Sequence, residues 1–331
     1  LEIVLDRPKA NALDAPSSRK MGEVFADFRD DPELRVAILT GAGDKFFSAG
    51  WDLNAVAEGE GYFDDFGEGG FGGFAEMTDL LKPIICAVNG MAVGAGFEML
   101  LRSDFIIAAE HARFMLPEVR IGIAPDVGTF MLPKLLSRQK ALEILMTGRQ
   151  FGAHQLASLG LINEVAPSDQ LMVRARALAE DLLRAAPLSL AAIKEAVRLT
   201  EKLTFEESYA ALRTKSWPAF MKMLESEESR EGASAFVEKR EPEWKGRLEL
   251  EGACMSMTIE KKILAKGKEL GFSLAGIARV EDLKASKSFE IYDKKPYYPE
   301  YKGVEWKPEH KSVLVWALAH PPSDPVLDWW S

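Results

Sequence analysis

The sequence predicts an α/β fold for most of its 331 residues, followed by a smaller α/β segment. Three observations lead to this prediction. Short apolar runs typical of buried strands, at residues 36–39 and 84–89, alternate with helical patterns. A long helical stretch then covers residues 169–241, and a second, short strand-and-helix pattern follows a junction at 248–256. A chain of this length is expected to form two domains.

Composition excludes several functional classes. The formal net charge of −10 argues against a nucleic-acid partner, because phosphate binding requires a basic surface. No apolar run is long enough to span a membrane. Two cysteines, Cys86 and Cys254, cannot build a disulfide framework or a four-cysteine metal site. This cysteine usage favours a reducing cytoplasm, and hydrophobic content of 47% allows a large core.

The first elements follow from apolar patterning. Residues 1–5 predict a strand, and Ser17 or Ser18 is expected to cap a helix that carries Met21, Val24, Phe25 and Phe28 on one face. Residues 36–39 predict a buried strand that ends at a glycine turn, and residues 46–53 predict a short strand followed by another turn.

Residues 58–76 differ from their surroundings, because they are rich in glycine, acids and aromatic residues. The composition alone favours a surface loop. The alternative is a lid over a substrate site, with contacts from Tyr62, Phe63, Phe66, Phe71 and Phe74.

The central stretch, residues 89–125, predicts a strand, a glycine turn, a helix and a second strand that ends near Leu116. Gly94-Ala95-Gly96 allows a ligand to approach the backbone at a helix start, where N–H groups are unpaired. Glu98 follows on that helix, and Glu118 comes after the second strand. We expect the two carboxylates to face each other across a thioester substrate.

Such an arrangement suits chemistry at the α-carbon of a thioester. Backbone donors aimed at the carbonyl oxygen would stabilise an enolate, one carboxylate would activate water, and the other would exchange a proton with the α-carbon. Burial and mutual repulsion would raise at least one carboxyl pKa. This chemistry needs no metal, and neither His111 nor His154 has the partners of a catalytic triad. From spacing alone, surface positions for both glutamates remain the alternative.

The remainder of the first unit is mostly helical. Helices are predicted at 139–147 and 152–159, a strand at 162–165, and four helices across 169–241 with breaks near Pro187, Leu203 and Ser226. After the junction, the sequence predicts a helix at 259–270 and strands at 273–279 and 312–320. The chain stops without a closing signal, which is typical of a truncated unit.

Residues 1–247 resemble the enoyl-CoA hydratase/isomerase superfamily, whose fold is called crotonase-like. The resemblance rests on four blocks: LDRPKANALD at 5–14, GAGDKFFSAGWDL at 41–53, KPIICAVNGMAVGAGFEM at 82–99 and LPEVRIGIAPDVG at 116–128. FFSAGWDL, AEGE at 57–60, MTGR at 146–149 and EKREPEWKGR resemble the carnitinyl-CoA dehydratase subgroup. The resemblance implies a ββα spiral core with a C-terminal helical trimerisation region, assembled as a homotrimer or dimer of trimers. It also implies an acyl-CoA substrate and no separate cofactor, with coenzyme A as part of the substrate.

The resemblance also implies roles for individual residues. The oxyanion N–H groups would come from Trp51 and Ala95, and the acid/base pair would be Glu98 and Glu118. Coenzyme A and the acyl group would contact the residues Lys9, Ala10, Ala49, Gly50, Asp52, Leu53 and Gly94. Ala95 departs from the usual glycine, which is tolerable if its φ is negative.

Asp126, eight residues after Glu118, is an extra acid. It could cap the following helix, relay a proton or pair with a cationic substrate. Trp51 and the aromatic, acidic residues 58–76 could hold a trimethylammonium group. An isomerase that uses Glu118 or Asp126, and a non-catalytic acyl-CoA-binding protein, are the alternatives to a hydratase.

The last segment, residues 257–331, has a resemblance of its own. KELGFSLAGIARVEDL at 268–283 and HKSVLVWALAHPP resemble the N-terminal part of iron–sulfur proteins related to epoxyqueuosine reductase. The cluster cysteines of those proteins lie further downstream and are not among these residues, so neither an iron–sulfur cluster nor cobalamin is carried over from the resemblance. The role of this segment stays open.

Overall fold

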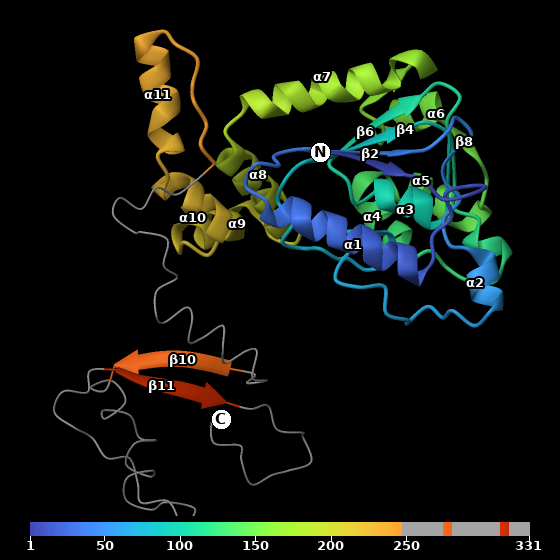
Figure 1. The fold of residues 1–331 in the computed structure, drawn as a ribbon, viewed down its shortest axis with the longest axis horizontal. Coiled ribbons are helices and arrows are strands. Elements are labelled where there is room, and N and C mark those ends of the chain that lie inside the picture. Colours follow the sequence, from blue (N-terminus) through green and yellow to red (C-terminus); the bar gives the residue numbers. More distant parts are fainter. Residues whose placement is uncertain (247–273, 280–311, 318–331) are drawn as a thin grey trace, which may run out of the picture. The chain divides into compact units, whose positions relative to one another are not determined.

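The structure is a computed structural model that describes residues 1–246, 274–279 and 312–317 (Figure 1). The chain divides into two compact units, Leu1–Glu249 and Leu250–Ser331. Within the first unit, helices surround two sheets, and the predicted α/β class is confirmed. The finer division, with a linker at 248–256, stays a prediction because those residues lie outside the described ranges.

The larger sheet has five parallel strands in the order β1-β2-β4-β6-β9. Their bounds are β1 Glu2–Leu5, β2 Ala37–Gly41, β4 Ile84–Val88, β6 Phe105–Ala109 and β9 Glu164–Ala166. Every residue of β2 and β4 is buried, so both faces of this sheet are covered. This explains why the two strands read as continuous apolar runs rather than as alternating patterns.

A second sheet has four strands in the order β3-β5-β7-β8. Their bounds are β3 Phe46–Ser48, β5 Met91–Val93, β7 Arg113–Met115 and β8 Phe151–Gly152; β8 alone runs antiparallel to its neighbour. Successive strands from β2 to β7 alternate between the two sheets. A short helix follows each pair: α2 Leu53–Ala57, α3 Ala95–Leu100 and η2 Glu118–Arg120. Because β3, β5 and β7 are parallel neighbours, their carboxyl ends lie side by side, as in other parallel sheets that bind ligands there.

The first helix, α1 Ala15–Asp30, corrects the predicted cap. Its N-cap is Asp14, whose side chain accepts the Ser17 N–H at 2.9 Å, while the Ser17 hydroxyl accepts the Asp14 N–H at 2.9 Å. Ser17 therefore occupies the third helical position of a capping box. Ser18 is fully buried, and its hydroxyl accepts the N–H of Gly72 at 3.2 Å. Met21, Phe25 and Phe28 are buried on one face of α1 as predicted, whereas Val24 is only half-buried.

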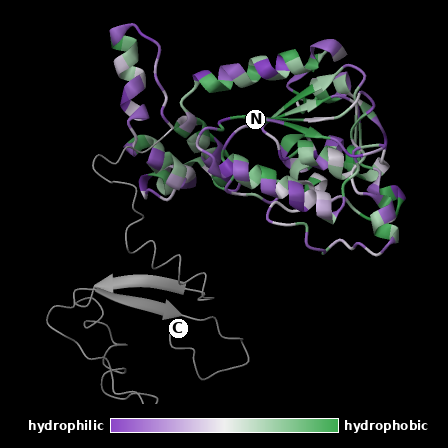
Figure 2. Cartoon of the chain, in the orientation of Figure 1, coloured by the Kyte–Doolittle hydropathy of each residue, from purple (hydrophilic) through white to green (hydrophobic). Residues whose placement is uncertain are grey.

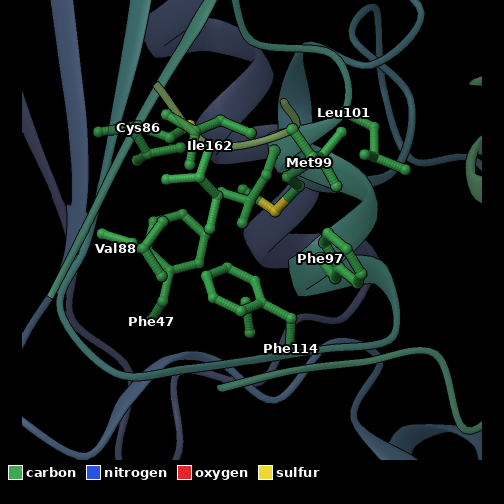
Figure 3. Packing of buried hydrophobic residues seen from close by; sticks show 14 of the residues in the cluster. Phe47, Cys86, Val88, Phe97, Met99, Leu101, Phe114 and Ile162 are labelled. Atoms are coloured by element: carbon green, nitrogen blue, oxygen red, sulfur yellow. The ribbon is translucent and has the colours of Figure 1, made fainter. Parts of the chain in front are cut away.

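The core lies on both faces of the five-stranded sheet. On one face, side chains from β3, β4, β7 and α3 meet in a cluster that includes Phe47, Val88, Phe97 and Phe114 (Figure 3). On the other face, Ile38, Ile85 and Ile107 pack beneath helix α7 Leu171–Arg184. Figure 2 shows the strands of this sheet as hydrophobic, whereas α7 carries both hydrophobic and hydrophilic residues. Cys86, within the apolar strand β4, is buried in the first cluster.

Helices dominate after residue 126. Their bounds are α4 Val127–Leu135, α5 Arg138–Thr147, α6 Ala153–Ser158, α7 Leu171–Arg184, α8 Pro187–Thr200, α9 Phe205–Arg213, α10 Pro218–Glu225 and α11 Glu228–Glu238, with the 3-10 turn η3 Ser168–Gln170 before α7. Another 3-10 turn, η1 Phe71–Gly73, lies earlier, between α2 and β4. Residues 169–241 hold five helices rather than the predicted four. The missed break lies before Pro218, which has no N–H and begins α10.

In the second unit, β10 Leu274–Arg279 and β11 Ser312–Ala317 form an antiparallel pair. The strands predicted at 273–279 and 312–320 are confirmed over these residues. The helix predicted at 259–270 lies outside the described residues.

Candidate active site

The carboxyl ends of β3, β5 and β7 form one side of a cavity of about 880 Å³. We call the turns that follow these strands, together with Glu98 and Glu118, the floor. Residues 58–76, which we call the cover segment, line the cavity with several aromatic rings. Six acidic residues also line it: Asp52, Asp64, Glu76, Glu98, Glu118 and Asp126. Arg102 is the one cationic side chain among its described lining residues, so the cavity favours a ligand with positive charge.

Glu98 lies in the first turns of α3 and is only 7% exposed. Its Oε1 accepts the N–H of Gly128 at 2.7 Å, which fixes the carboxyl group against the start of α4. Burial raises the pKa of Glu98 to about 8, and the nearby carboxylates of Asp126 and Glu118 act in the same direction. At neutral pH this group can therefore both donate and accept a proton.

Glu118 begins η2, after the end of β7, and is 8% exposed. Its Oε2 is buried and has no hydrogen-bond partner among the described residues. An unsatisfied buried carboxylate oxygen is costly, so it is a candidate for contact with a reacting group. Burial raises the pKa of Glu118 above its ordinary value, and the charge of Asp126 adds to this effect.

Two backbone N–H groups at the cavity have no protein acceptor among the described residues. Trp51 pairs with Leu13, and the hydrogen bonds of this bridge use Gly50 and Asp52 instead of the Trp51 N–H. Ala95 is the first residue of α3, where an N–H has no partner within the helix. Within the described part of the chain, neither N–H donates to another protein group. Both residues line the cavity.

Glycines allow these two segments to approach each other. Gly50 has φ +80°, and a Cβ there would lie 2.5 Å from the Val93 carbonyl oxygen and 2.9 Å from the Ala95 nitrogen. Gly94 has φ +56°, and a Cβ there would lie 2.8 Å from Glu118 Oε1. The positive φ falls on Gly94, and Ala95 is not among the residues with positive φ, so alanine is accommodated.

The predicted coenzyme A and acyl contacts are only partly brought together. Ala49, Asp52, Leu53 and Gly94 line the cavity, and Gly50 packs behind it. Ala10 does not line it, but its carbonyl accepts the Ala49 N–H at 2.9 Å. Lys9 is exposed, with φ +77°, and is also outside the cavity lining.

Asp126 takes one of its predicted roles, the helix cap, and it also lies at the cavity. It is the N-cap residue of α4, where its side chain accepts the Val127 N–H at 2.5 Å. It also lines the cavity, where Tyr62 and Glu98 are its neighbours. Burial and the Asp126 carboxylate raise the pKa of Tyr62. The sequence could not show that Gly128, two residues later, donates to Glu98. Gly128 stood inside a recognised block without an assigned role.

Four of the five aromatic residues predicted to contact substrate lie at the cavity. Tyr62, Phe63, Phe66 and Phe71 line the cavity. Phe74 was predicted to join them, but it is 2% exposed and packs on Phe25, with ring centroids 4.5 Å apart. Its ring belongs to the core because the turn η1 directs it beneath α1.

Trp51, Phe66 and Phe71 form an aromatic cluster beside the floor. The ring centroids of Phe66 and Phe71 are 5.1 Å apart, and Trp51 meets their rings edge-on at 6.5 and 6.1 Å. Edge-to-face rings at these separations stabilise one another and leave faces for a ligand. Arg102, Phe130 and Met131 also line the cavity, and the sequence offered no signal for them.

Other candidate chemistry lies away from this cavity. His111 hydrogen-bonds the Ser168 hydroxyl at 2.8 Å and the Asp44 backbone carbonyl at 2.9 Å, so its second ring nitrogen meets a carbonyl and not the carboxylate of a catalytic triad. Among the described residues, no cluster of His, Cys, Asp or Glu could hold a metal ion. No helix of that part of the chain is long and apolar enough to cross a membrane.

Among known protein families, the enoyl-CoA hydratase/isomerase family matches residues 1–247 of this chain. A carnitinyl-CoA dehydratase from Escherichia coli O157:H7 is 54% identical over 248 residues, which are 75% of this chain and 95% of that protein. The crystal structure of a carnitinyl-CoA hydratase from Mycobacterium avium is 39% identical, with TM-score 0.57, over 74% of this chain and 95% of that one.

An enoyl-CoA hydratase structure from Mycobacterium marinum is 35% identical, with TM-score 0.67, and covers 74% of this chain and 95% of that one. These matches confirm the spiral fold that the sequence resemblance implied for residues 1–247. They give no support to the resemblance between residues 257–331 and iron–sulfur proteins. Most of these residues lie outside the described part of the chain.

Proposed function

Because the chain belongs to the enoyl-CoA hydratase/isomerase family, we propose that it is a hydro-lyase that adds water to a 2-enoyl-CoA thioester or removes it. One observation carries the proposal. Two buried carboxyl groups, Glu98 and Glu118, line the same cavity as the unpaired N–H groups of Trp51 and Ala95. This is the set of groups that an enolate mechanism requires.

The thioester carbonyl oxygen would accept the N–H groups of Trp51 and Ala95. Water addition places negative charge on that oxygen, and preorganised donors then stabilise it without rearrangement, an effect worth about 3–4 kcal/mol per donor. The α3 N-terminus adds its partial positive charge.

The two glutamates would divide the proton transfers. In hydration, ionised Glu98 takes a proton from water while the oxygen bonds to the β-carbon, and the double-bond electrons move to the enolate. Glu118 then gives a proton to the α-carbon. In dehydration each step reverses, and protonated Glu98 supplies the proton that leaves with the hydroxyl group. A Glu98 pKa of about 8 leaves both forms populated near neutrality, which suits a reversible reaction.

The acyl group that best fits the cavity carries a trimethylammonium cation, as in crotonobetainyl-CoA and carnitinyl-CoA. Aromatic faces attract such cations, and the cover segment supplies Tyr62, Phe63, Phe66 and Phe71. Asp64 and Glu76 of the same segment add negative charge. The names of the curated relatives agree with this substrate.

An isomerase is the second candidate, and Asp126 is the observation that favours it. Its carboxylate lies at the cavity beside Glu98, where it could move a proton between carbons. A non-catalytic acyl-CoA-binding protein has no such support, since both glutamates are buried at the cavity.

Turnover of crotonobetainyl-CoA and crotonyl-CoA in ¹⁸O-labelled water tests the proposal. A hydratase places label on the β-carbon, with the higher kcat/KM for the cationic substrate. Double-bond migration without label would replace it by the isomerase, and binding without any reaction would leave a binding protein. Equal kcat/KM for the two substrates would contradict the proposal that the acyl group carries a cation.

The remaining expectations are part of the same proposal. The enzyme would need no cofactor beyond the coenzyme A of its substrate, and it would work in the cytoplasm. Trimers, or dimers of trimers, would form through the C-terminal helices. There Phe205, Phe236 and Val237 are 72%, 85% and 79% exposed, an unusual state for apolar side chains. Sedimentation analysis tests this assembly.

A further inference from the structure

Glu60, near the start of the cover segment, joins three parts of the chain. Its Oε1 accepts the indole N–H of Trp51 at 2.6 Å. Its Oε2 accepts the backbone N–H of Ala15, the first residue of α1, at 2.9 Å. A carboxylate at a helix N-terminus is favoured by the helix dipole, so Glu60 is held firmly at that end.

The Trp51 indole thereby has a fixed direction. Its nitrogen is tied to Glu60, while its ring meets Phe66 and Phe71 edge-on. The same residue lines the cavity, and its backbone N–H has no acceptor among the described residues. Trp51 therefore connects the proposed oxyanion position of the floor with Phe66 and Phe71, the cover-segment rings of the aromatic cluster.

We propose that Glu60 is a positioning residue that sets the acyl specificity of the enzyme by orienting the Trp51 indole. Glu60 does not line the cavity, so it acts through Trp51 and not by contact with substrate. This inference rests on the proposed function, because it assumes that the aromatic cluster contacts the acyl group of the substrate.

The role depends on a carboxylate. Two N–H donors reach Glu60, and its two oxygens accept one each. A glutamine of the same shape has one carbonyl oxygen, and its NH₂ group would oppose the second donor. Glu60→Gln therefore releases either the indole or the α1 end of the tie, although the volume of the side chain is unchanged.

The first test compares substrates in Glu60→Gln. We expect kcat/KM for crotonobetainyl-CoA to fall about tenfold, the scale of a lost charge-assisted hydrogen bond, mainly through KM. The kcat/KM for crotonyl-CoA should fall less than threefold, because this substrate has no cationic group to contact the aromatic cluster. Glu58→Gln is the matched control, because Glu58 lies in the same segment, is exposed, and is outside the cavity lining. An equal loss with both substrates would indicate a general structural role and overturn the inference.

The second test is a double-mutant cycle with Trp51→Phe, which removes the indole N–H but keeps the backbone donor. Glu60→Gln should cost at least threefold less in the Trp51→Phe background than in the wild type. Additive losses would show that Glu60 does not act through the indole.

A binding measurement separates this inference from the proposed function. The saturated thioester γ-butyrobetainyl-CoA carries the cationic acyl group but has no double bond to hydrate. If the wild-type protein binds this ester but does not turn over crotonobetainyl-CoA, the proposed hydro-lyase activity is contradicted. The double-mutant cycle of Glu60→Gln and Trp51→Phe, measured through the Kd of this ester, would still test the role of Glu60. If the wild type binds neither this ester nor butyryl-CoA, the inference falls with the proposed function.

Discussion

The floor and the cover segment of the cavity are built differently. The floor is attached to the carboxyl ends of the parallel strands β3, β5 and β7. The register of these strands sets the spacing of Trp51, Ala95 and Glu118. The cover segment has only the short turn η1 as regular structure, and side-chain contacts hold it. Examples are the ion pair of Arg29 with Glu68 and the tie made by Glu60.

Under the proposed function, we expect this difference to divide the work, with the reaction at the floor and the choice of acyl group at the cover segment. Chemistry needs groups fixed to within a fraction of an ångström, which a sheet provides. Choice of an acyl group needs adjustable side chains, and a loop can change these without disturbing the fold. We expect floor variants to lower the rate for every substrate, and cover variants to change the preference between substrates.

The largest effects should come from the two floor glutamates. Glu98→Gln and Glu118→Gln should each lower kcat by about 10²–10⁴-fold, the contribution of a positioned acid or base. The loss should be similar for crotonobetainyl-CoA and crotonyl-CoA in steady-state assays. Glu110→Gln, an exposed residue outside the cavity lining, is the control and should retain full activity. Activity above a tenth of wild type in either floor variant would contradict the assignment.

Gly94→Ala tests the geometry of the floor without removing a functional group. The added Cβ would lie 2.8 Å from Glu118 Oε1 and displace that carboxyl group, so we expect kcat to fall about 10²-fold. Gly160→Ala is matched to it, because Gly160 also has positive φ, +80°, but nothing lies within 4 Å of a Cβ there. Both variants should lose about 1 kcal/mol of unfolding free energy. Only Gly94→Ala should lose activity, and equal activities would disprove the displacement.

Phe66→Ala tests the cover segment. Removing one ring of the aromatic cluster should raise Kd for the cationic γ-butyrobetainyl-CoA about tenfold, within the range of a cation–π contact. The Kd of butyryl-CoA, which has the same chain without the cation, should change less than threefold by calorimetry. Parallel losses for the two esters would show that Phe66 only closes the cavity and does not select the cation.

The smallest effect concerns pH and joins the two regions through Asp126. Glu98 ionises with a pKa of about 8, so kcat/KM for hydration should rise with pH up to this value, and kcat/KM for dehydration should fall above it. Asp126→Asn removes a charge that raises this pKa but keeps an N-cap, because asparagine caps helices as well as aspartate does. Both transitions should then move to lower pH by a few tenths of a unit. Unshifted profiles would mean that Asp126 does not influence Glu98.

The sequence predicted the floor better than the cover segment, and the reason is physical. Glycines with positive φ at Gly50 and Gly94, and acids within apolar flanks at Glu98 and Glu118, are local requirements that remain visible in a linear text. The ββα alternation between two sheets was available only through family resemblance, because a buried strand reads the same in either sheet.

Contacts between distant segments could not be predicted. Phe74 and Phe71 have similar neighbours in the sequence, yet one ring enters the core and the other the cavity. The tie between Glu60 and Trp51 depends on where the cover segment returns to the floor, and no local pattern encodes it. The Asp14 cap was missed for a different reason, since Ser17 and Ser18 offered equally good capping residues nearby.

The most direct test of the division between floor and cover segment is one ratio, kcat/KM for crotonobetainyl-CoA divided by that for crotonyl-CoA. It should be measured in wild type, Glu118→Gln and Phe66→Ala under identical conditions. We predict that Glu118→Gln keeps the wild-type ratio while both rates collapse, and that Phe66→Ala lowers the ratio about tenfold while crotonyl-CoA turnover stays near wild type. A ratio that changes in Glu118→Gln but not in Phe66→Ala would contradict the account.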